Sequence, residues 1–347
     1  MEERGRSFLN NGRILLEDLI ASCDGRSNPI RNYSASELIR ATNNFDSSCI
    51  IQNCSPTAAE ASQFHRFIHV YPAHGYKMFK GFLDGRSIIV KKFMGTEDET
   101  RSLAIRDIVV SIQMSNHKNV LKLLGCCLEF PIPALVHEYA TKGVVSYEGG
   151  FGAKESLPWK IRLRIAKQLA NALTYLHTAF PRPIVHRDLK PNCIILDENY
   201  VPKLCNFSLS ITIPPKQSYA EDIPKGTFGY VDPTYMRSGY ISEKGDVYSF
   251  GVLLLVFLTG QQALNTYQEG GKYQSIIRYV KSHACDGQIE TIVDPKVLGE
   301  VKGDKQHLHD FLALALLCTH DSSEVRPHMI NVAKELVRIE KSILLAS

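Results

Sequence analysis

The stretch that decides the fold of this chain is His186-Arg187-Asp188-Leu189-Lys190-Pro191-Asn192-Cys193. It leads directly into an apolar run, Ile194-Ile195-Leu196, which predicts a short buried strand and is followed by Asp197. Thirteen residues after Cys193 stands a second motif, Asn206-Phe207-Ser208. We expect these two motifs and the strand between them to lie at the centre of the fold.

The two motifs resemble the catalytic loop and the metal-binding motif of protein kinases. In kinases, His-Arg-Asp-Leu-x-x-x-Asn ends in an Asn that holds magnesium, and Asp-Phe-Gly supplies the main magnesium ligand. Here Cys193 stands in place of the first ligand, and Asn206-Phe207-Ser208 replaces Asp-Phe-Gly. Because both metal ligands are missing, the resemblance implies a kinase fold that has lost phosphoryl transfer.

Asn192 leaves one alternative open. A slip of one residue in the loop would aim Asn192 at a metal in place of Cys193, but it would also shift the following strand out of register. Asn206 could still donate a hydrogen bond to a phosphate, although it brings no negative charge to a magnesium site. We therefore expect no metal site, and we interpret Asp188 and Lys190 as vestiges of a catalytic site.

Length and composition favour a bilobed globular protein. The 347 residues are 44% hydrophobic and 22% charged, which suffices for a sizeable core. A net charge of +4 without a basic block gives no reason to expect nucleic-acid binding. Nine irregularly spaced cysteines indicate a reducing compartment. The longest apolar runs, Val252 to Leu258 and Phe311 to Cys318, are too short to cross a bilayer.

Residues 1–32 form a polar extension without a leader peptide pattern. Within it, Gly12 to Ala21 predicts a short docking helix capped by Asn10 or Asn11. Its apolar residues fall on one side: Ile14, Leu15, Leu19 and Ile20. Cys23 beyond this helix could be palmitoylated or could remain a free thiol.

The segment Tyr33 to Phe45 resembles the stretch that precedes the kinase domain in plant receptor-like kinases. Its helix is expected to begin at Ser34 or Ser36 and to end at Asn43-Asn44. Two apolar side chains of this helix should face inward: Leu38 and Ile39.

The expected nucleotide site lacks its glycine-rich turn. Residues 46–80 contain no G-x-G-x-x-G, and bulky residues and proline occupy the stretch from Cys54 to Gly75. The glycines at positions 149–152 precede a helix, which predicts a surface loop rather than a phosphate-binding turn. By the kinase resemblance, His137 occupies the gatekeeper position.

Ile88-Ile89-Val90-Lys91 matches the Val-Ala-Ile-Lys strand of kinases, in which the lysine pairs nucleotide phosphates with a glutamate of the next helix. Lys91 is thus a vestigial ATP lysine. The position of the glutamate is taken by Ile108. Asp107 is shorter and turned by one helical step, so we expect no bridge from Asp107 to Lys91. Ile89 would fill part of the adenine space.

Other family features are partly kept. Asp232-Pro233-Thr234 corresponds to Ala-Pro-Glu with a threonine where the family has glutamate, so its ion pair with Arg326 is expected to be broken. Asp246 should still anchor the catalytic-loop backbone. His186 and Phe207 are of the types that stack in a hydrophobic spine between the lobes.

The segment Ile211 to Lys225 would be ordered by phosphorylation in an active kinase. Its three prolines predict little stable secondary structure and an exposed, mobile position on the larger lobe. Apolar and basic side chains along it could anchor a partner: Ile211, Ile213, Tyr219, Ile223, Lys216 and Lys225.

From Tyr33 to about Glu340 the chain resembles plant receptor-like cytoplasmic kinases of the wall-associated type, and most of all the pseudokinases related to HopZ-ETI-deficient. The resemblance implies an α+β bilobed fold with an N-terminal extension (1–45), an N-lobe (46–140) and a C-lobe (141–347). It also implies a cytoplasmic adaptor in plant innate immunity. Such adaptors dock on the leucine-rich repeats of a coiled-coil NLR receptor and capture another receptor-like cytoplasmic kinase modified by a bacterial effector.

Two other functions stay open. One is a residual serine/threonine kinase with ATP as phosphoryl donor, in which Asp188, Lys190 and Lys91 still act. The other is an allosteric activator of an active kinase. For the adaptor we expect ATP and magnesium to bind weakly or not at all, no cofactor, and contact with the plasma membrane only through partners.

Overall fold

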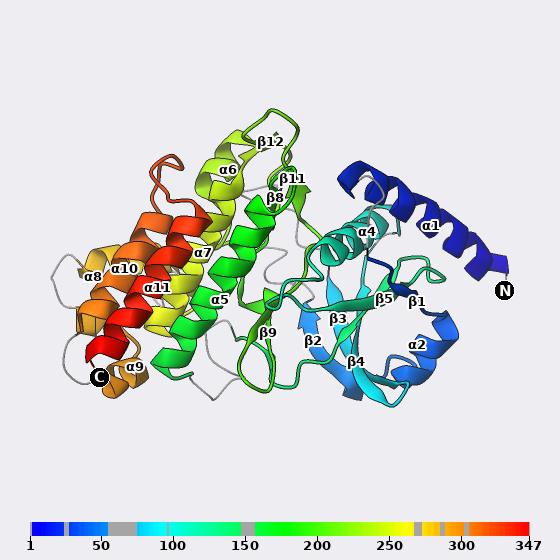
Figure 1. Cartoon of the computed structure of the whole chain (residues 1–347), viewed down its shortest axis with the longest axis horizontal. Coiled ribbons are helices and arrows are strands. Elements are labelled where there is room, and N and C mark those ends of the chain that lie inside the picture. The colour runs from blue at the N-terminus through cyan, green and yellow to red at the C-terminus, as the bar shows by residue number, and fades with distance from the viewer. Residues whose placement is uncertain are drawn as a thin grey trace.

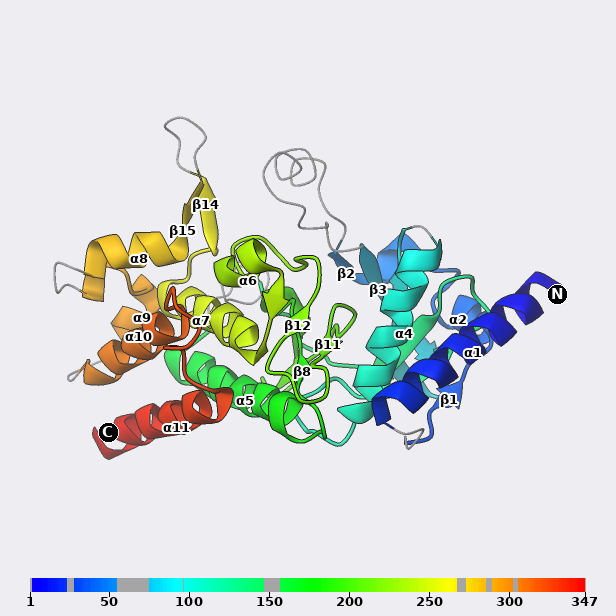
Figure 2. The ribbon, with the colours of Figure 1, turned by 90° about the horizontal axis from the view of Figure 1, so that it is seen from above.

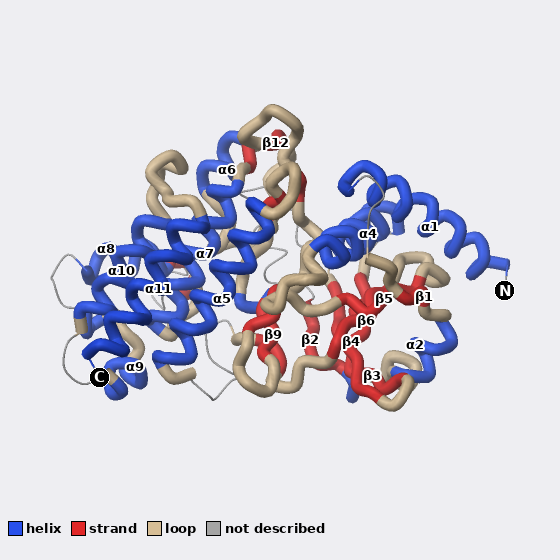
Figure 3. The backbone as a smooth tube through the Cα atoms, viewed as in Figure 1, coloured by secondary structure: helices blue, strands red, loops and turns tan. Residues whose placement is uncertain are grey.

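The computed structural model describes residues 2–23, 28–54, 75–95, 97–146, 157–266, 273–284, 289–301 and 305–346. The chain forms two lobes, with most strands in one and most helices in the other (Figures 1 and 3). This arrangement confirms the predicted α+β bilobed fold. The stretch 55–74, the glycines at 149–152 and the side chain of Cys23 lie outside the described residues.

The N-lobe is built on a six-stranded sheet with the order β1-β5-β6-β4-β3-β2. Its strands are β1 (Arg31–Asn32), β2 (Ile50–Cys54), β3 (Tyr76–Leu83), β4 (Arg86–Phe93), β5 (Leu123–Cys127) and β6 (Ala134–Glu138). The strand expected at Ile88 to Lys91 is confirmed as part of β4, which pairs with β3 across the turn at Asp84-Gly85. The N-terminal extension supplies β1, which pairs in parallel with β5. A side chain at Gly125 would meet the Arg31 carbonyl oxygen at 2.0 Å, so this pairing requires glycine there.

The N-terminal helix α1 (Glu2–Cys23) is more than twice as long as predicted. Asn10 and Asn11 lie inside it, so the predicted cap is wrong. Asn11 is buried, and its side-chain amide donates to the backbone oxygens of Leu128 and Phe130, both at 2.9 Å. Asparagine by itself favours the end of a helix, but these long-range bonds hold Asn11 in the interior of α1. Of the apolar residues expected on one side of this helix, Leu15 and Leu19 pack on the core of the sheet, whereas Ile20 is exposed.

Helix α2 (Ala35–Ala41) follows the sequence prediction closely. Ser34 caps it, and Glu37 closes a capping box by accepting from the Ser34 backbone N–H at 2.7 Å. Leu38 is buried, and the left-handed residues Asn43 and Asn44 follow the helix end. A 3-10 turn, Ser47–Cys49, then leads into β2.

Helix α4 (Glu97–Gln113) lies between the sheet and α1, as two perpendicular views indicate (Figures 1 and 2). Its buried residues Ala104, Ile108 and Ile112 join the apolar core of the sheet, against which Leu15 and Leu19 of α1 also pack. The helix therefore carries the N-terminal extension on its outer side and the sheet on its inner side.

The C-lobe is helical around one large apolar core. Its helices are α5 (Trp159–Thr178), α6 (Pro233–Ser238), α7 (Glu243–Thr259), α8 (Ile276–Ala284), α9 (Pro295–Glu300), α10 (Gln306–Cys318) and α11 (Met329–Ala346), with 3-10 turns at Pro191–Cys193 and Ile289–Thr291. Short strands complete it: β7 (Gly143–Val144), β8 (Ile184–Val185), β9 (Ile194–Leu196), β10 (Pro202–Leu204), β11 (Ile211–Thr212), β12 (Ala220–Glu221), β13 (Tyr240–Ile241), β14 (Leu264–Thr266) and β15 (Tyr273–Ser275). No helix within the described ranges is long and apolar enough to span a membrane.

The segment Ile211 to Lys225 has more structure than its prolines predict. Strand β11 pairs with β8, and β12 pairs with β13. Ile213 and Ala220 are buried in a small apolar cluster, so Ile213 is not the exposed anchor that was expected. Its backbone N–H donates to the Pro183 oxygen at 2.9 Å. The prediction was wrong because both pairing partners are distant in sequence and leave no local signal.

Candidate functional site

Lys91 lies at the centre of the site between the lobes. Its ammonium group is fully buried and donates to Asp107 Oδ2 at 2.6 Å and to Asn206 Oδ1 at 2.5 Å. The prediction that Asp107 forms no bridge to Lys91 is therefore wrong. Ile108 packs into the sheet core and draws α4 close enough for the short Asp107 side chain to reach Lys91. Asp107 Oδ1 also accepts from the Phe207 backbone N–H at 2.8 Å.

Two aromatic rings complete the surroundings of Lys91. The Lys91 nitrogen lies 4.0 Å from the centre of the Tyr76 ring and 4.5 Å from that of Phe93. Burial holds the pKa of the Tyr76 hydroxyl well above its usual value, so it carries no charge. A cation over ring faces is stabilised by the ring quadrupole. Two side-chain oxygens and two aromatic rings thus surround the Lys91 ammonium.

The base-binding side of the cleft carries bulky residues as well. Ile89 on β4 is fully buried and pairs across the sheet with His137 on β6. Burial lowers the pKa of His137 to about 4, so this side chain is neutral at physiological pH.

Cys193 occupies the inward position of the catalytic loop. Its thiol is fully buried and donates to the Asp188 backbone oxygen at 3.1 Å. Burial raises its pKa to about 12, so it presents no anionic ligand to a metal. The Asn192 side chain points instead toward β2, where its amide lies 3.5 Å from Cys54 Sγ. The slipped loop is therefore not adopted.

Asn206 adopts a left-handed backbone conformation with a φ of 68°. Besides Lys91, its side-chain oxygen accepts from the Ser208 hydroxyl at 3.1 Å, and its amide lies 3.8 Å from Cys193 Sγ. The residues at the two expected metal positions thus bind each other. Among the described residues, no group of three or more His, Cys, Asp or Glu side chains could hold a metal ion.

Part of the catalytic machinery remains assembled. Asp188 Oδ2 lies 2.9 Å from Lys190 Nζ, and Asp188 Oδ1 accepts from the Thr227 hydroxyl at 2.5 Å. Lys190 also donates to the Thr227 oxygen at 2.6 Å, which closes a triangle. Thr227 was missed by sequence reasoning, although the run Gly226-Thr227-Phe228-Gly229 next to the expected Ala-Pro-Glu position was the available signal.

The prediction for Asp246 is confirmed. Its carboxylate accepts from the backbone N–H groups of His186 and Arg187 at 2.7 and 2.8 Å, and it lies 2.8 Å from His177 Nε2. The His186 ring stacks edge-on against Phe207 with centroids 5.3 Å apart, as expected for the spine.

Arg187 is held without a phosphate. Its guanidinium donates to Asp222 Oδ2 at 2.7 Å, to the Ile223 backbone oxygen at 2.8 Å and to the Tyr235 hydroxyl. Burial acts to raise the pKa of Asp222, but the charge and hydrogen bond of Arg187, together with the Lys225 charge and the Ile223 backbone N–H, outweigh burial and hold that pKa below its usual value. Asp222 is therefore ionised and supplies the negative charge that holds Arg187.

The ion pair of Arg326 is rebuilt rather than lost. Arg326 donates to Asp232 through two bonds of 2.6 and 2.9 Å, and both side chains are buried. The prediction of a broken pair is therefore wrong. Asp232, two positions before Thr234, supplies the carboxylate while it also caps α6 by accepting from the Thr234 backbone N–H at 2.8 Å.

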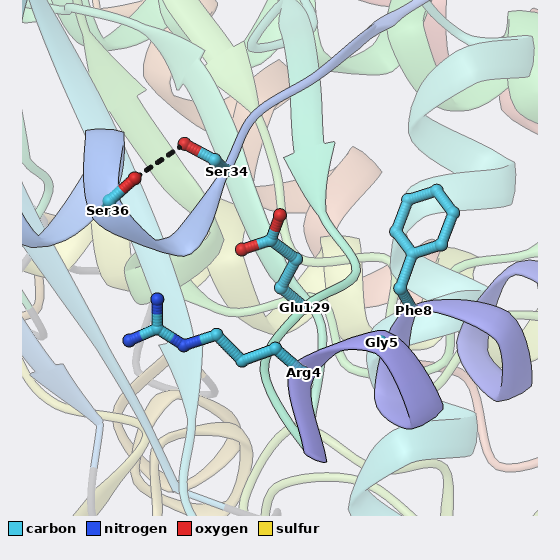
Figure 4. Close-up of a pocket in the computed structure, with 6 residues that line it drawn as sticks. All are labelled: Arg4, Gly5, Phe8, Ser34, Ser36 and Glu129. Atoms are coloured by element: carbon cyan, nitrogen blue, oxygen red, sulfur yellow. Dashed lines mark hydrogen bonds between the residues drawn. The ribbon is translucent and has the colours of Figure 1, made fainter. Parts of the chain in front are cut away.

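A separate surface pocket lies between α1 and the start of α2 (Figure 4). It is lined by Arg4, Gly5, Phe8, Ser34, Ser36 and Glu129. Glu129 accepts from the Ala35 backbone N–H at 2.8 Å, so a carboxylate already occupies the first turn of α2. This pocket is distinct from the site around Lys91.

Comparisons with known proteins agree with this geometry. A family model for the protein kinase domain matches residues 77–335. Serine/threonine-protein kinase ZRK1 of Arabidopsis thaliana is 42% identical over 97% of this chain and 93% of its own length. The non-functional pseudokinases ZRK2 and ZED1 of the same plant are 43% and 41% identical, over 96% and 98% of this chain and 89% and 98% of their own lengths. The chain therefore belongs to the protein-kinase family and, within it, to the group that contains ZRK1 and the pseudokinases ZRK2 and ZED1.

Proposed function

We propose that this protein is a catalytically impaired pseudokinase that acts as an adaptor in plant innate immunity. It links the leucine-rich repeats of an NLR receptor to receptor-like cytoplasmic kinases that a pathogen effector has modified. The proposed loss of catalysis rests on one observation above all: Asn206, which stands at the metal-ligand position, brings no carboxylate and instead accepts a hydrogen bond from Lys91, whose ammonium also faces the Tyr76 ring.

The surroundings of Lys91 oppose ATP binding energetically. The Lys91–Asp107 bridge is the counterpart of the lysine–glutamate pair of active kinases and does not itself exclude ATP. A nucleotide phosphate would instead have to compete with the Asn206 hydrogen bond and the Tyr76 ring for the Lys91 ammonium, and a hydrogen bond to a charged group is worth roughly 1.5–3 kcal/mol. No carboxylate stands at position 206 to hold the magnesium that would offset this cost. The names of ZRK2 and ZED1 as non-functional pseudokinases support the same reading.

Two exposed apolar surfaces support the adaptor role. The first, here called the α1 stripe, is formed by residues spaced at seven and four positions on the outer side of α1: Leu9, Leu16 and Ile20, which are 72%, 57% and 55% exposed. The second, the segment patch, joins β13 to residues 210–225, here called the activation segment: Tyr219, Ile223 and Tyr240, which are 46%, 53% and 47% exposed. We assign receptor docking to the α1 stripe and capture of the modified kinase to the segment patch.

A pair of triple variants tests this assignment, and each serves as the control of the other. Serine substitutions at Tyr219, Ile223 and Tyr240 should abolish capture of the modified kinase and spare receptor docking. Serine substitutions at Leu9, Leu16 and Ile20 should do the reverse. The wild-type chain is first used for affinity purification from plant tissue with mass spectrometry, which names the partners. Equal retention of both partners by both variants would contradict the assignment.

A residual serine/threonine kinase is the second candidate function. It is favoured by the intact triangle of Asp188, Lys190 and Thr227, and by the name of ZRK1 as a serine/threonine-protein kinase. A radiolabelled phosphate transfer assay with the purified chain separates the two candidates. Transfer above the level of an Asp188→Ala variant would establish the kinase, whereas equal background levels support the pseudokinase.

A further inference from the structure

The C-terminal end of α1 is bound by both lobes. Arg182, in the C-lobe loop between α5 and β8, donates to the Ala21 backbone oxygen at 3.0 Å. On α4, Gln113 donates to the Ser22 backbone oxygen at 3.3 Å. The last turn of α1 contains no basic residue, although cations stabilise this end of a helix dipole. Side chains from outside the helix therefore complement its negative end.

Arg106 of α4 extends these contacts to the activation segment. On one side its guanidinium donates to Ser22 Oγ at 3.3 Å and lies 3.7 Å from Asp18 Oδ1, both in α1. On the other side it donates to the Ser210 backbone oxygen at 2.9 Å and to Thr212 Oγ1 at 2.6 Å. One planar side chain thus joins α1 to the first residues of the activation segment, in the region where α1 approaches β8 and β11 (Figure 2).

We propose that Arg106 couples α1 to the activation segment, so that the two move and open as one unit. The planar guanidinium holds its N–H donors in a rigid fork, so one Arg106 side chain bonds α1 and residues 210–212 at the same time. Strand β11 has only two residues, so it depends on such side-chain contacts for its position. An occupant of the α1 stripe would then stiffen the segment patch. Only this last step rests on the proposed adaptor function.

Hydrogen–deuterium exchange on the whole chain in isolation tests the coupling. Loss of charge-assisted bonds in Arg106→Gln should speed exchange about tenfold in residues 210–213 and also in residues 18–22. The matched control is Arg101→Gln on the same helix, whose side chain is 14% exposed against 15% for Arg106. Arg101 donates to Asp98 Oδ1 at 3.0 Å and to the Pro131 backbone oxygen at 3.2 Å, and both of these partners lie in the N-lobe. If Arg106→Gln affects only one of the two segments, or if the control affects both, the proposal is wrong.

A double-mutant cycle that combines Asn11→Ala with Arg106→Gln gives a second test. Asn11→Ala loosens α1 at a point eleven residues from Ser22, roughly 16 Å along the helix. Effects of sites this far apart are normally additive. Coupling through Arg106 instead predicts that Asn11→Ala speeds exchange at residues 210–213 in the wild-type background and adds nothing in the Arg106→Gln background. Additive effects, or no effect at 210–213, would overturn the proposal. Because no partner is needed, the result is independent of the adaptor function.

Discussion

Replacement of Asp232 by asparagine should destabilise the C-lobe strongly. Asp232 and Arg326 form a buried pair through bonds of 2.6 and 2.9 Å. Removal of one partner from such a pair typically costs 3–5 kcal/mol, because the other charge stays buried without compensation. An asparagine side chain at position 232 keeps one hydrogen-bond acceptor and can still cap α6. We therefore expect the free energy of unfolding to fall by about 3 kcal/mol, at the lower end of that range.

Urea denaturation followed by circular dichroism measures this loss. The midpoint should fall while the slope of free energy against urea stays unchanged, since the same surface is exposed on unfolding. The control is Asp84→Asn, which removes a carboxylate from an exposed pair with Arg31 at 2.5 Å, and it should leave the midpoint unchanged. A midpoint for Asp232→Asn equal to that of the wild type would refute the rebuilt pair.

Two further predictions concern the cleft. Restoration of both metal ligands, with Cys193→Asn and Asn206→Asp together, should not raise phosphate transfer above an Asp188→Ala background, because a bound metal accelerates transfer only when the nucleotide is held. Transfer by the double variant would contradict the account. Burial lowers the folded-state pKa of His137 to about 4, so between pH 6.5 and 4 the unfolded state binds the extra proton and stability falls as pH falls. His137→Phe should remove roughly 2 kcal/mol of the stability difference between pH 7.5 and 5, measured by urea midpoints; an unchanged difference would show that His137 does not titrate as inferred.

The fold was predictable because its signals are local or lie in ordered, spaced motifs. The capping residue Ser34 predicts the start of α2, and the match of Ile88-Ile89-Val90-Lys91 to the kinase lysine strand predicts β4. Asp246 could be assigned from its motif alone, since its role is to bind the backbone of another motif. Motif spacing likewise assigns Cys193 and Asn206 to the two positions at which kinases carry their metal ligands.

The rest depended on contacts that sequence does not encode locally. A helical register could not decide whether Asp107 reaches Lys91, because the answer depends on how closely α4 packs on the sheet. The carboxylate that pairs with Arg326 comes from Asp232, two positions before Thr234. A comparison of motifs position by position therefore predicted that the ion pair is absent, although the folded chain forms it with another residue. Helix α1 is extended through Asn11 by bonds to residues more than a hundred positions away. The enclosure of Lys91 by Tyr76 was missed for the same reason.

The most direct test of the closed nucleotide site is the melting temperature of the purified chain across a titration of magnesium and ATP. A ligand present at 100 times its Kd adds about 2.7 kcal/mol to the free energy of unfolding, which is a readily measured shift. The contacts of Lys91 with Asn206 and the Tyr76 ring, and the lack of a carboxylate at position 206, predict no shift at millimolar Mg-ATP. A dose-dependent rise that requires magnesium and disappears in Lys91→Met would contradict it.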